Sequence, residues 1–280
     1  IFGFGHDGSS YNAQTNLVSN AGVVATDTTG VGTARKSLAA TEYGGDKGIF
    51  GFGHDGSSYT AVTNLVSNAG VVATDVTGVG TARGENLGAC SYGGDKGIFG
   101  FGYTTGNVGM TNLVSNAGVV ASDVTAVGTA RRGLAACEYG GDKGIFGFGY
   151  TASVTAVTNL VSNAGVVASD VTGVGTARRD LAACGYGNDK GIFGYGGSNL
   201  SMTNLVSNAG VVGTDVTGVG TARHLLAACE YGEDKGIFGF GYDGSSYLSM
   251  SNLVSNAGVV GTDVTGVGTA RLEAAACSFN

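Results

Sequence analysis

The sequence of 280 residues is dominated by one block of twenty residues that occurs six times. Its first copy, NLVSNAGVVATDTTGVGTAR, runs from Asn16 to Arg35, and only four of the twenty positions vary among the copies. The arginine that ends each copy returns after 48, 48, 47, 45 and 48 residues. A period in the high forties is typical of propeller blades, so the chain is expected to build one supersecondary unit six times.

The composition favours strands over helices. The chain has 54 Gly and no Pro, which excludes collagen, and its 42% hydrophobic and 12% charged residues exclude ordinary disorder. The repeated stretch GVVATDVTGVG is β-branched and glycine-rich, and each glycine inside a helix would cost about 1 kcal/mol relative to alanine. We therefore expect a single all-β domain over residues 1–280.

Each repeat divides into four short strand candidates joined by turn sequences such as GGDKG and NAG. In the third full unit the four candidates are Leu134–Gly140, Lys143–Gly149, Val157–Asn163 and Gly165–Val171. Because side chains alternate along a strand, Phe146 and Phe148 are expected to share one face of the second strand.

The two ends of the chain predict how the ring is joined. Ile1–Gly5 reads as a second strand without its first, and Ala274–Asn280 reads as a first strand alone. The C-terminal strand is therefore expected to complete the N-terminal blade, which removes an open edge. The sequence predicts a six-bladed β-propeller with four-stranded antiparallel blades, closed in this way.

The segment GTARRGLAACEYGGDKGIFGFG, Gly128–Gly149, resembles the kelch repeat, and the resemblance recurs through all 280 residues. In that family a Thr-Ala-Arg-like segment leads into a small-residue strand, a glycine turn and a strand that ends in Phe-Gly-Gly. The resemblance implies a β-propeller. Here GFG usually replaces the double glycine, which only Gly194–Gly197 keeps, and Trp is absent. The near-identical repeats are also similar to kelch-like arrays in bacteriophage and marine environmental proteins.

Charge and hydropathy narrow the expected partners. The net charge is −7, and the basic residues are spread along the chain rather than clustered, so no nucleic-acid binding is expected. No apolar run approaches the length of a membrane span, and no signal peptide is visible in IFGFG. The compartment and the oligomeric state stay open, with a virion or an extracellular surface among the possibilities.

Five cysteines occupy equivalent places in the first strand of successive repeats: Cys90, Cys137, Cys184, Cys229 and Cys277, with Thr41 in the sixth place. Equivalent positions one blade apart are poor disulfide partners, so buried free thiols are expected. The alternative is a ring of metal-binding thiols near the axis.

Other chemical motifs are weak. Gly3–Gly8 matches a dinucleotide-binding pattern, but the helix that the pattern needs does not follow. The three histidines, His6, His54 and His224, lie in different repeats, so no catalytic triad, metal or cofactor is expected, and the chain is predicted not to be an enzyme. Asp7, Asp55 and Asp243 stand in DG turns, which favours hairpins over calcium loops.

Two charged residues recur in register in every repeat, and we expect an Arg–Asp bond in each repeat to tie the fourth strand to the crossover into the next blade. They are Arg35, Arg83, Arg131, Arg178, Arg223 and Arg271, with Asp27, Asp75, Asp123, Asp170, Asp215 and Asp263. The alternative is a charged ring that binds a ligand at the mouth of the channel.

The repeats differ mainly in two connections, from the second to the third strand and after the repeated arginine. In an up-and-down blade both emerge on one face, so a binding site for a glycan or a protein is predicted there, as an attachment module. The candidate contacts are His6, Asp7, Tyr11, His54, Asp55, Tyr59, Tyr103, Tyr150, Asn199, Tyr242, Asp243 and Tyr247. The alternative functions are a purely architectural disc and, less favoured, a propeller enzyme.

Overall fold

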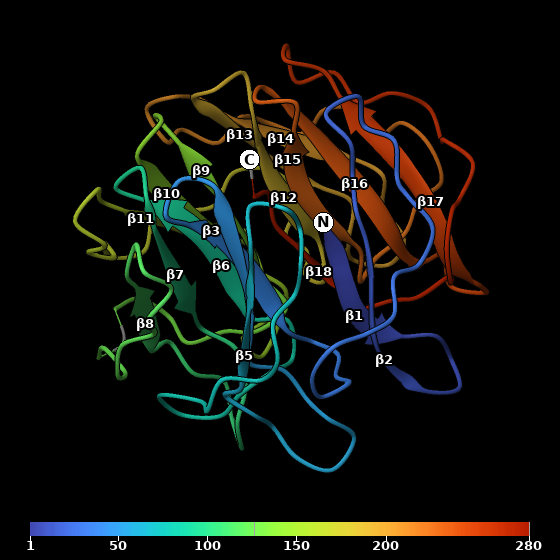
Figure 1. Cartoon of the computed structure of the whole chain (residues 1–280). Coiled ribbons are helices and arrows are strands. Elements are labelled where there is room, and N and C mark those ends of the chain that lie inside the picture. The colour runs from blue at the N-terminus through green and yellow to red at the C-terminus, as the bar shows by residue number, and fades with distance from the viewer. Residues whose placement is uncertain (126, 280) are drawn as a thin grey trace.

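The computed structural model describes residues 1–125 and 127–279, and its regular elements over these residues are all β-strands (Figure 1). They form six antiparallel sheets of three strands each. In sheet order, sheet 1 contains β18 (Ala275–Ala276), β1 (Phe2–His6) and β2 (Tyr11–Asn16), and sheet 2 contains β3 (Ala39–Tyr43), β4 (Lys47–Gly51) and β5 (Thr63–Val66). Sheet 3 contains β6 (Gly88–Tyr92), β7 (Lys96–Gly100) and β8 (Thr111–Val114), and sheet 4 contains β9 (Ala135–Tyr139), β10 (Lys143–Gly147) and β11 (Thr158–Val161). Sheet 5 contains β12 (Ala182–Tyr186), β13 (Lys190–Gly194) and β14 (Thr203–Val206), and sheet 6 contains β15 (Ala227–Tyr231), β16 (Lys235–Tyr242) and β17 (Tyr247–Val254).

The sheets are arranged around an axis in a way consistent with a β-propeller-like repeat fold. The first strands of the six sheets, β18, β3, β6, β9, β12 and β15, contact one another in a cycle (Figure 1). Strand β18 pairs with β1 in the register Phe2↔Ala276, so the chain ends in the sheet in which it begins. This pairing of the two ends was predicted from the sequence.

The predicted fourth strand is wrong, and each sheet has three strands. In the third full unit, residues 165–171 meet β11 only at two isolated bridges. Between these bridges Asn159 Nδ2 donates to the main-chain oxygen of Ala168 at 3.0 Å and to Asp170 Oδ1 at 2.9 Å. The side-chain amide thus lies within the ladder, between main-chain bonds on either side of it, at the point where the register of the two bridges changes by one residue. We call this stretch, and its equivalents in the other sheets, the outer segment.

A bulge in the second strand overturns the expectation that Phe146 and Phe148 share a face. Phe148 has a φ of 63°, in the left-handed region, and all five equivalent residues do the same. The ring of Phe146 packs edge-on against Phe101 of the preceding sheet, with centroids 5.1 Å apart, whereas Phe148 packs against Phe193 of the following sheet at 5.2 Å. One strand therefore supplies aromatic side chains to both of its neighbours.

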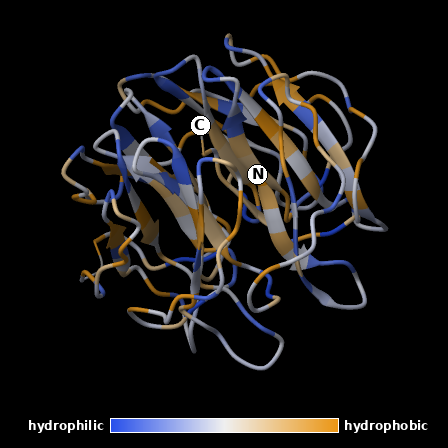
Figure 2. Cartoon of the chain, viewed as in Figure 1, coloured by the Kyte–Doolittle hydropathy of each residue, from blue (hydrophilic) through white to orange (hydrophobic). Residues whose placement is uncertain are grey.

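The hydrophobic core is divided into six clusters that lie between neighbouring sheets. Figure 2 shows the hydrophobic colour along the strands and also on loops at the periphery (Figure 2). Each sheet thus needs its neighbours on both sides to bury its own faces. Among the described residues, no helix has the length and hydropathy to cross a bilayer.

The repeated arginine is the junction between sheets, and it is fully buried in nearly every copy. Arg83 Nε donates to the main-chain oxygen of Phe101 (2.8 Å), Nη1 to that of Thr81 (3.1 Å) and Nη2 to Asn112 Oδ1 (2.6 Å). The guanidinium carbon also lies 4.2 Å from the ring centroid of Phe52 in the preceding sheet. The carbonyl that accepts the bond from Nε belongs to the bulge residue, so the bulge places an acceptor for the arginine.

The repeated aspartate reaches the same junction through a threonine. Asp123 accepts hydrogen bonds from Thr81 N (3.1 Å) and Thr81 Oγ1 (2.6 Å), whereas Arg83 Nη1 lies 3.9 Å from Asp123 Oδ1. The carboxylate near each arginine belongs to the following repeat. These residues therefore tie adjacent sheets together, and the buried arginines lie between the sheets rather than at a channel mouth.

The connections separate onto two faces, as the up-and-down pattern predicts. The loop between the second and third strands pairs with the segment after the repeated arginine, for example through Arg132↔Tyr150. On the opposite face the first turn meets the turn after the third strand, for example where Asn163 Nδ2 donates to Asp142 Oδ2 at 3.0 Å. We call these the variable face and the constant face.

We expect Arg83→Leu to lower the free energy of unfolding by about 3–5 kcal/mol, because it leaves the carbonyl of Phe101 and the amide oxygen of Asn112 buried without their donor. Denaturant unfolding followed by circular dichroism measures the loss. The control is Lys96→Ala, which removes an exposed ion pair with Asp95 and should change stability by less than about 1 kcal/mol. Equal effects of the two variants would contradict this role.

Candidate functional site

The hairpin turns on the variable face use their own acidic side chains. Asp7 Oδ1 accepts hydrogen bonds from the two following serine amides, both at 2.8 Å, and Asn12 Nδ2 donates to Asp7 Oδ2 at 3.0 Å. The bond from Asn12 is the main cause that holds the pKa of Asp7 below its ordinary value. Asp55 and Asp243 make the same bonds to serine amides. These carboxylates fix the turns that present the neighbouring rings.

Two histidines are oriented by the same turns. His6 Nδ1 accepts a hydrogen bond from the amide of Gly8, and His54 Nδ1 accepts one from the amide of Gly56, both at 3.0 Å. Each imidazole is therefore held as the tautomer that carries its proton on Nε2. The outward edge of each ring is left as a hydrogen-bond donor.

The aromatic side chains of the variable face form one connected band. Consecutive ring centroids are 5.6 Å apart for His224–Tyr242, 5.4 Å for Tyr242–Tyr247, 6.4 Å for Tyr247–His6, 5.1 Å for His6–Tyr11, 6.2 Å for Tyr11–His54, 5.1 Å for His54–Tyr59 and 6.2 Å for Tyr59–Tyr103. All of these side chains are half-buried. The rings thus stay in contact across the boundaries between sheets.

Guanidinium groups continue the band where rings are wider apart. The Arg132 guanidinium carbon lies 4.5 Å from the Tyr103 centroid and 5.6 Å from that of Tyr150, and Arg179 lies 4.8 Å from Tyr150. Cations over ring faces are attracted by the ring quadrupole. We call the whole band, comprising these residues and the rings above, the aromatic collar.

The collar has a gap at sheet 5. There the loop between the second and third strands is short. The turn glycine Gly8 packs against the ring of Tyr247 from the preceding sheet, whereas the equivalent Gly244 packs against Asn199. Asn199 Oδ1 and His224 Nδ1 are 2.7 Å apart. Beside Asn199 lies a hollow of about 410 Å³, lined also by Met202 and by the outer segment of the same sheet.

The structure gathers the candidate rings His6, Tyr11, His54, Tyr59, Tyr103, Tyr150, Tyr242 and Tyr247 into the collar, with Asn199 at its gap. Asp7, Asp55 and Asp243 lie in the turns behind it. Sequence reasoning missed Arg132, Arg179 and the collar role of His224. The available signal was that all three directly follow the repeated arginine.

An axial channel is narrowed at its variable-face end. Main-chain bonds run around this end from Ser37 to Glu273, then to Leu225, Asp180, Gly133 and Glu85, with donor–acceptor distances of 3.1, 2.9, 2.8, 2.7 and 3.0 Å. The loop of sheet 3 has one extra residue, and its Asn86 Nδ2 reaches Asp180 Oδ1 at 3.1 Å. This bond joins two loops that are not neighbours in the cycle.

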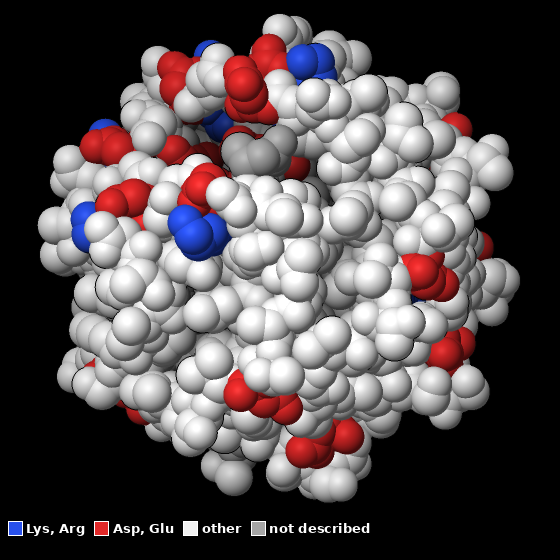
Figure 3. Space-filling model, in the orientation of Figure 1, with Lys and Arg blue, Asp and Glu red and all other residues white. Residues whose placement is uncertain are grey.

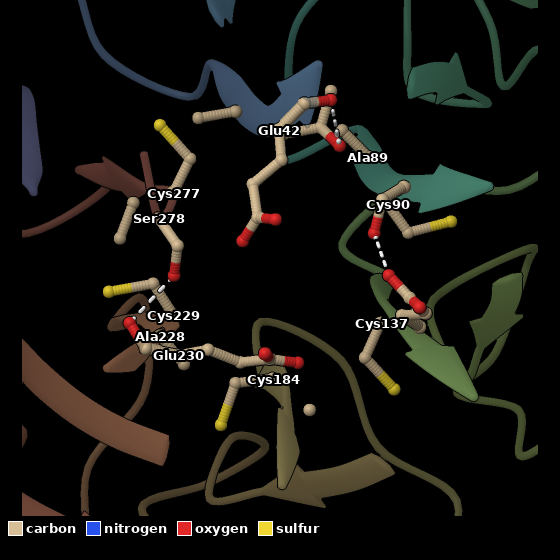
Figure 4. A pocket seen from close by; sticks show the side chains of 16 residues that line it. Glu42, Ala89, Cys90, Cys137, Cys184, Ala228, Cys229, Glu230, Cys277 and Ser278 are labelled. Carbon is tan, nitrogen blue, oxygen red and sulfur yellow. Dashed lines mark hydrogen bonds between the residues drawn. The ribbon is translucent and has the colours of Figure 1, made fainter. Parts of the chain in front are cut away.

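Near the constant face three glutamates line the same channel: Glu42, Glu138 and Glu230. Figure 4 shows the side chains of Glu42 and Glu230 extending into it. They alternate around the cycle with Ser91, Gly185 and Ser278. The hydroxyl of Ser91 donates to Glu138 Oε2, and a Cβ added to Gly185 would overlap the carboxyl group of Glu230 unless that group moved. Long and short side chains therefore alternate around the channel.

The pKa values of these glutamates are raised. Burial is the main cause for all three glutamates. The negative charge of Glu138 raises the pKa of Glu42 further, and the charges of Glu42 and Glu138 raise that of Glu230 further. Figure 3 shows acidic and basic side chains around the hollow near the C-terminus (Figure 3). On that side exposed Asp–Lys pairs, such as Asp95 with Lys96, occupy the first turns.

The cysteine row does not converge on the axis. Figure 4 shows the sulfur atoms turned away from the channel centre. A Cβ on Gly144 would collide with Cys90 Sγ, so this thiol fills the space that a glycine of the next sheet leaves. The same holds for Cys137, Cys184 and Cys277. All five thiols are free and buried, and burial raises the pKa of Cys277 to about 12. Within the described part of the chain, no group of three His, Cys, Asp or Glu side chains is placed to hold a metal ion.

No family model matches the chain, and comparison with curated proteins finds no match.

We expect the double variant Glu42→Gln/Glu230→Gln to stabilise the fold at about pH 8 and to have little effect near pH 4. A raised folded-state pKa contributes stability that is fully present below the ordinary glutamate pKa and is lost as pH rises through the folded value. Denaturant unfolding at the two pH values measures this. Glu233→Gln removes the same charge from an exposed turn and serves as the control. Equal stabilisation at both pH values would count against the channel environment.

The five thiols should resist a soluble disulfide reagent in the folded protein and should all react once it is unfolded. Counting the released chromophore with and without denaturant measures this. Rapid reaction of any thiol in the native protein would show that its intersheet packing opens.

Proposed function

We propose that this chain is a six-bladed, kelch-like propeller that acts as a non-catalytic binding module for a glycan. The observation that carries the proposal is the aromatic collar, because it lies on the face whose loops differ most among the repeats. Tyrosine rings supply rigid contact area at low conformational-entropy cost, and the apolar faces of sugar rings pack well against them.

Polar groups beside the rings suit the hydroxyls of a sugar. The Nε2–H edges of His6 and His54, the amide of Asn199 and the serines of the turns are donors or acceptors next to aromatic faces. Binding sites usually combine apolar contact with a few placed polar groups of this kind. The His6 and His54 Nδ1 atoms are engaged by their own turns, so they are not free to act as general bases, and this favours binding over catalysis.

The long collar favours an extended ligand over a single sugar unit. Rings from sheets 6, 1, 2, 3 and 4 follow one another around the face, so several contacts are available to one chain. An attachment role on a virion or a cell surface would use such repeated, individually weak contacts.

We expect the variant Tyr11→Ala/Tyr59→Ala to weaken glycan binding at least about tenfold, because it removes two central rings of the collar. A glycan array followed by calorimetry on the hits measures the change. Lys47→Ala on the constant face is the matched control and should bind like the unaltered chain. A hit that survives in the collar variant would place the site elsewhere, and an array without hits would redirect the search to protein partners or an architectural role.

A further inference from the structure

The outer segments expose the same apolar side chain in every repeat. Their first valines, Val23, Val71, Val119, Val166, Val211 and Val259, are each 64 or 65% exposed. A second valine, such as Val76 or Val171, is 46% exposed. Among the described residues every exposed large hydrophobic side chain is a valine, and all but Val154 lie in the outer segments or the crossovers that follow them. Because the first valine is equally exposed in all six repeats, its exposure is a property of the fold rather than of one loop.

The main chain of the outer segment is also open on its outer side. In the first repeat Ala25 N donates to Leu17 O, and Ser19 N donates to Val23 O. These bonds flank the bridge Val18↔Val24 and join the outer segment to the residues that directly follow β2. In an antiparallel pair the groups of the intervening residue point the other way, so the N–H and C=O of Val24 face outward. Such an edge can pair with another strand.

The outer edge of this segment carries almost no charged side chains that would prevent it from pairing with another strand. Between Ser19 and Ala34 the only charged residue is Asp27. Its carboxylate accepts hydrogen bonds from Thr269 N at 2.9 Å, Thr269 Oγ1 at 2.7 Å and Asn16 Nδ2 at 2.9 Å. Edge strands are commonly protected by lysine, proline or an inward charge, and this chain has no proline. Two copies could therefore bring their edges together without opposed charges, although each carries a net charge of −7.

We propose that the outer segments are a lateral interface through which copies of this chain associate edge to edge. A second copy is the fitting occupant because it brings the same uncharged, β-branched edge. A two-fold axis would place one outer segment antiparallel to its equivalent and pack valine against valine.

The size of one contact sets the mode of association. A few half-exposed valines per edge bury far less than the roughly 800 Å² per partner of a stable pairwise interface. One edge contact is therefore weak and reversible. Six edges around the molecule let several weak contacts act together, so association grows with concentration into planar assemblies. Both the variable face and the constant face stay uncovered in such a layer.

Sedimentation velocity from micromolar to millimolar concentration tests the proposal. The unaltered chain should show a sedimentation coefficient that rises with concentration, and ammonium sulfate should strengthen the association because the contact is apolar. The variant Val71→Lys/Val166→Lys/Val259→Lys should weaken it at least tenfold. Val154→Lys adds the same charge at an exposed valine on a variable-face loop and should associate like the unaltered chain.

The same positions changed to threonine keep the β-branched shape and remove only apolar surface, and this variant serves if the lysine variant does not fold. An unaltered chain that stays monomeric at every concentration would overturn the proposal. The proposal would also be overturned if the variants of Val71, Val166 and Val259 associated as the unaltered chain does, because the contact would then lie on one of the two faces.

Discussion

The buried arginine at each junction is the interaction on which the other features depend. The guanidinium of Arg83 binds the carbonyl of a bulge residue and an asparagine of the next sheet, and it stacks on an aromatic ring of the preceding one. The asparagine bond recurs at Arg35 and Arg271, whereas among the described residues Nη2 of the other three arginines has no hydrogen-bond partner. Burying a charge is costly unless hydrogen bonds and neighbouring groups compensate it. The bulge, the asparagine and the outer segment must therefore keep one geometry, and this requirement explains why the twenty-residue block is so nearly constant.

The same requirement explains where the repeats are free to differ. The loops of the variable face lie beyond the bulge, so their length and composition do not disturb the arginine site. The turns of the constant face are bound to each other by bonds such as Asn163 to Asp142, which demand particular residues. Divergence therefore collects on one face, and there it has produced the aromatic collar with its gap at Asn199.

Much of this organisation could be predicted from the sequence. The period, the turn residues and the split of the first sheet between the two chain ends predicted three strands of each unit, the pairing of β1 with β18 and the two faces. The fourth strand could not be predicted, because β-branched residues suggested a ladder and only the structure shows the side chain of Asn159 within it. The opposite directions of Phe146 and Phe148 were hidden for a related reason, since left-handed phenylalanine is rare and strict alternation is the default expectation.

The residue types of the candidate site could be predicted from the sequence, but the contacts between its side chains could not. Tyrosines and histidines in divergent loops were visible, whereas their contacts across sheets depend on how far the bulge turns each loop. The glutamates of the channel escaped attention because each stands in an otherwise ordinary strand, and only the cycle of inner strands brings Glu42, Glu138 and Glu230 together.

The alternation in the channel limits how alike the repeats can become. Copying a glutamate-bearing repeat over its neighbour would place two glutamates side by side, where even an alanine at Gly185 would fit only after the carboxyl group of Glu230 moved. At this position a six-fold array behaves as a three-fold one. A molecule built from one glutamate-bearing repeat would place six carboxyl groups in the channel, whereas one built from pairs of repeats would keep three.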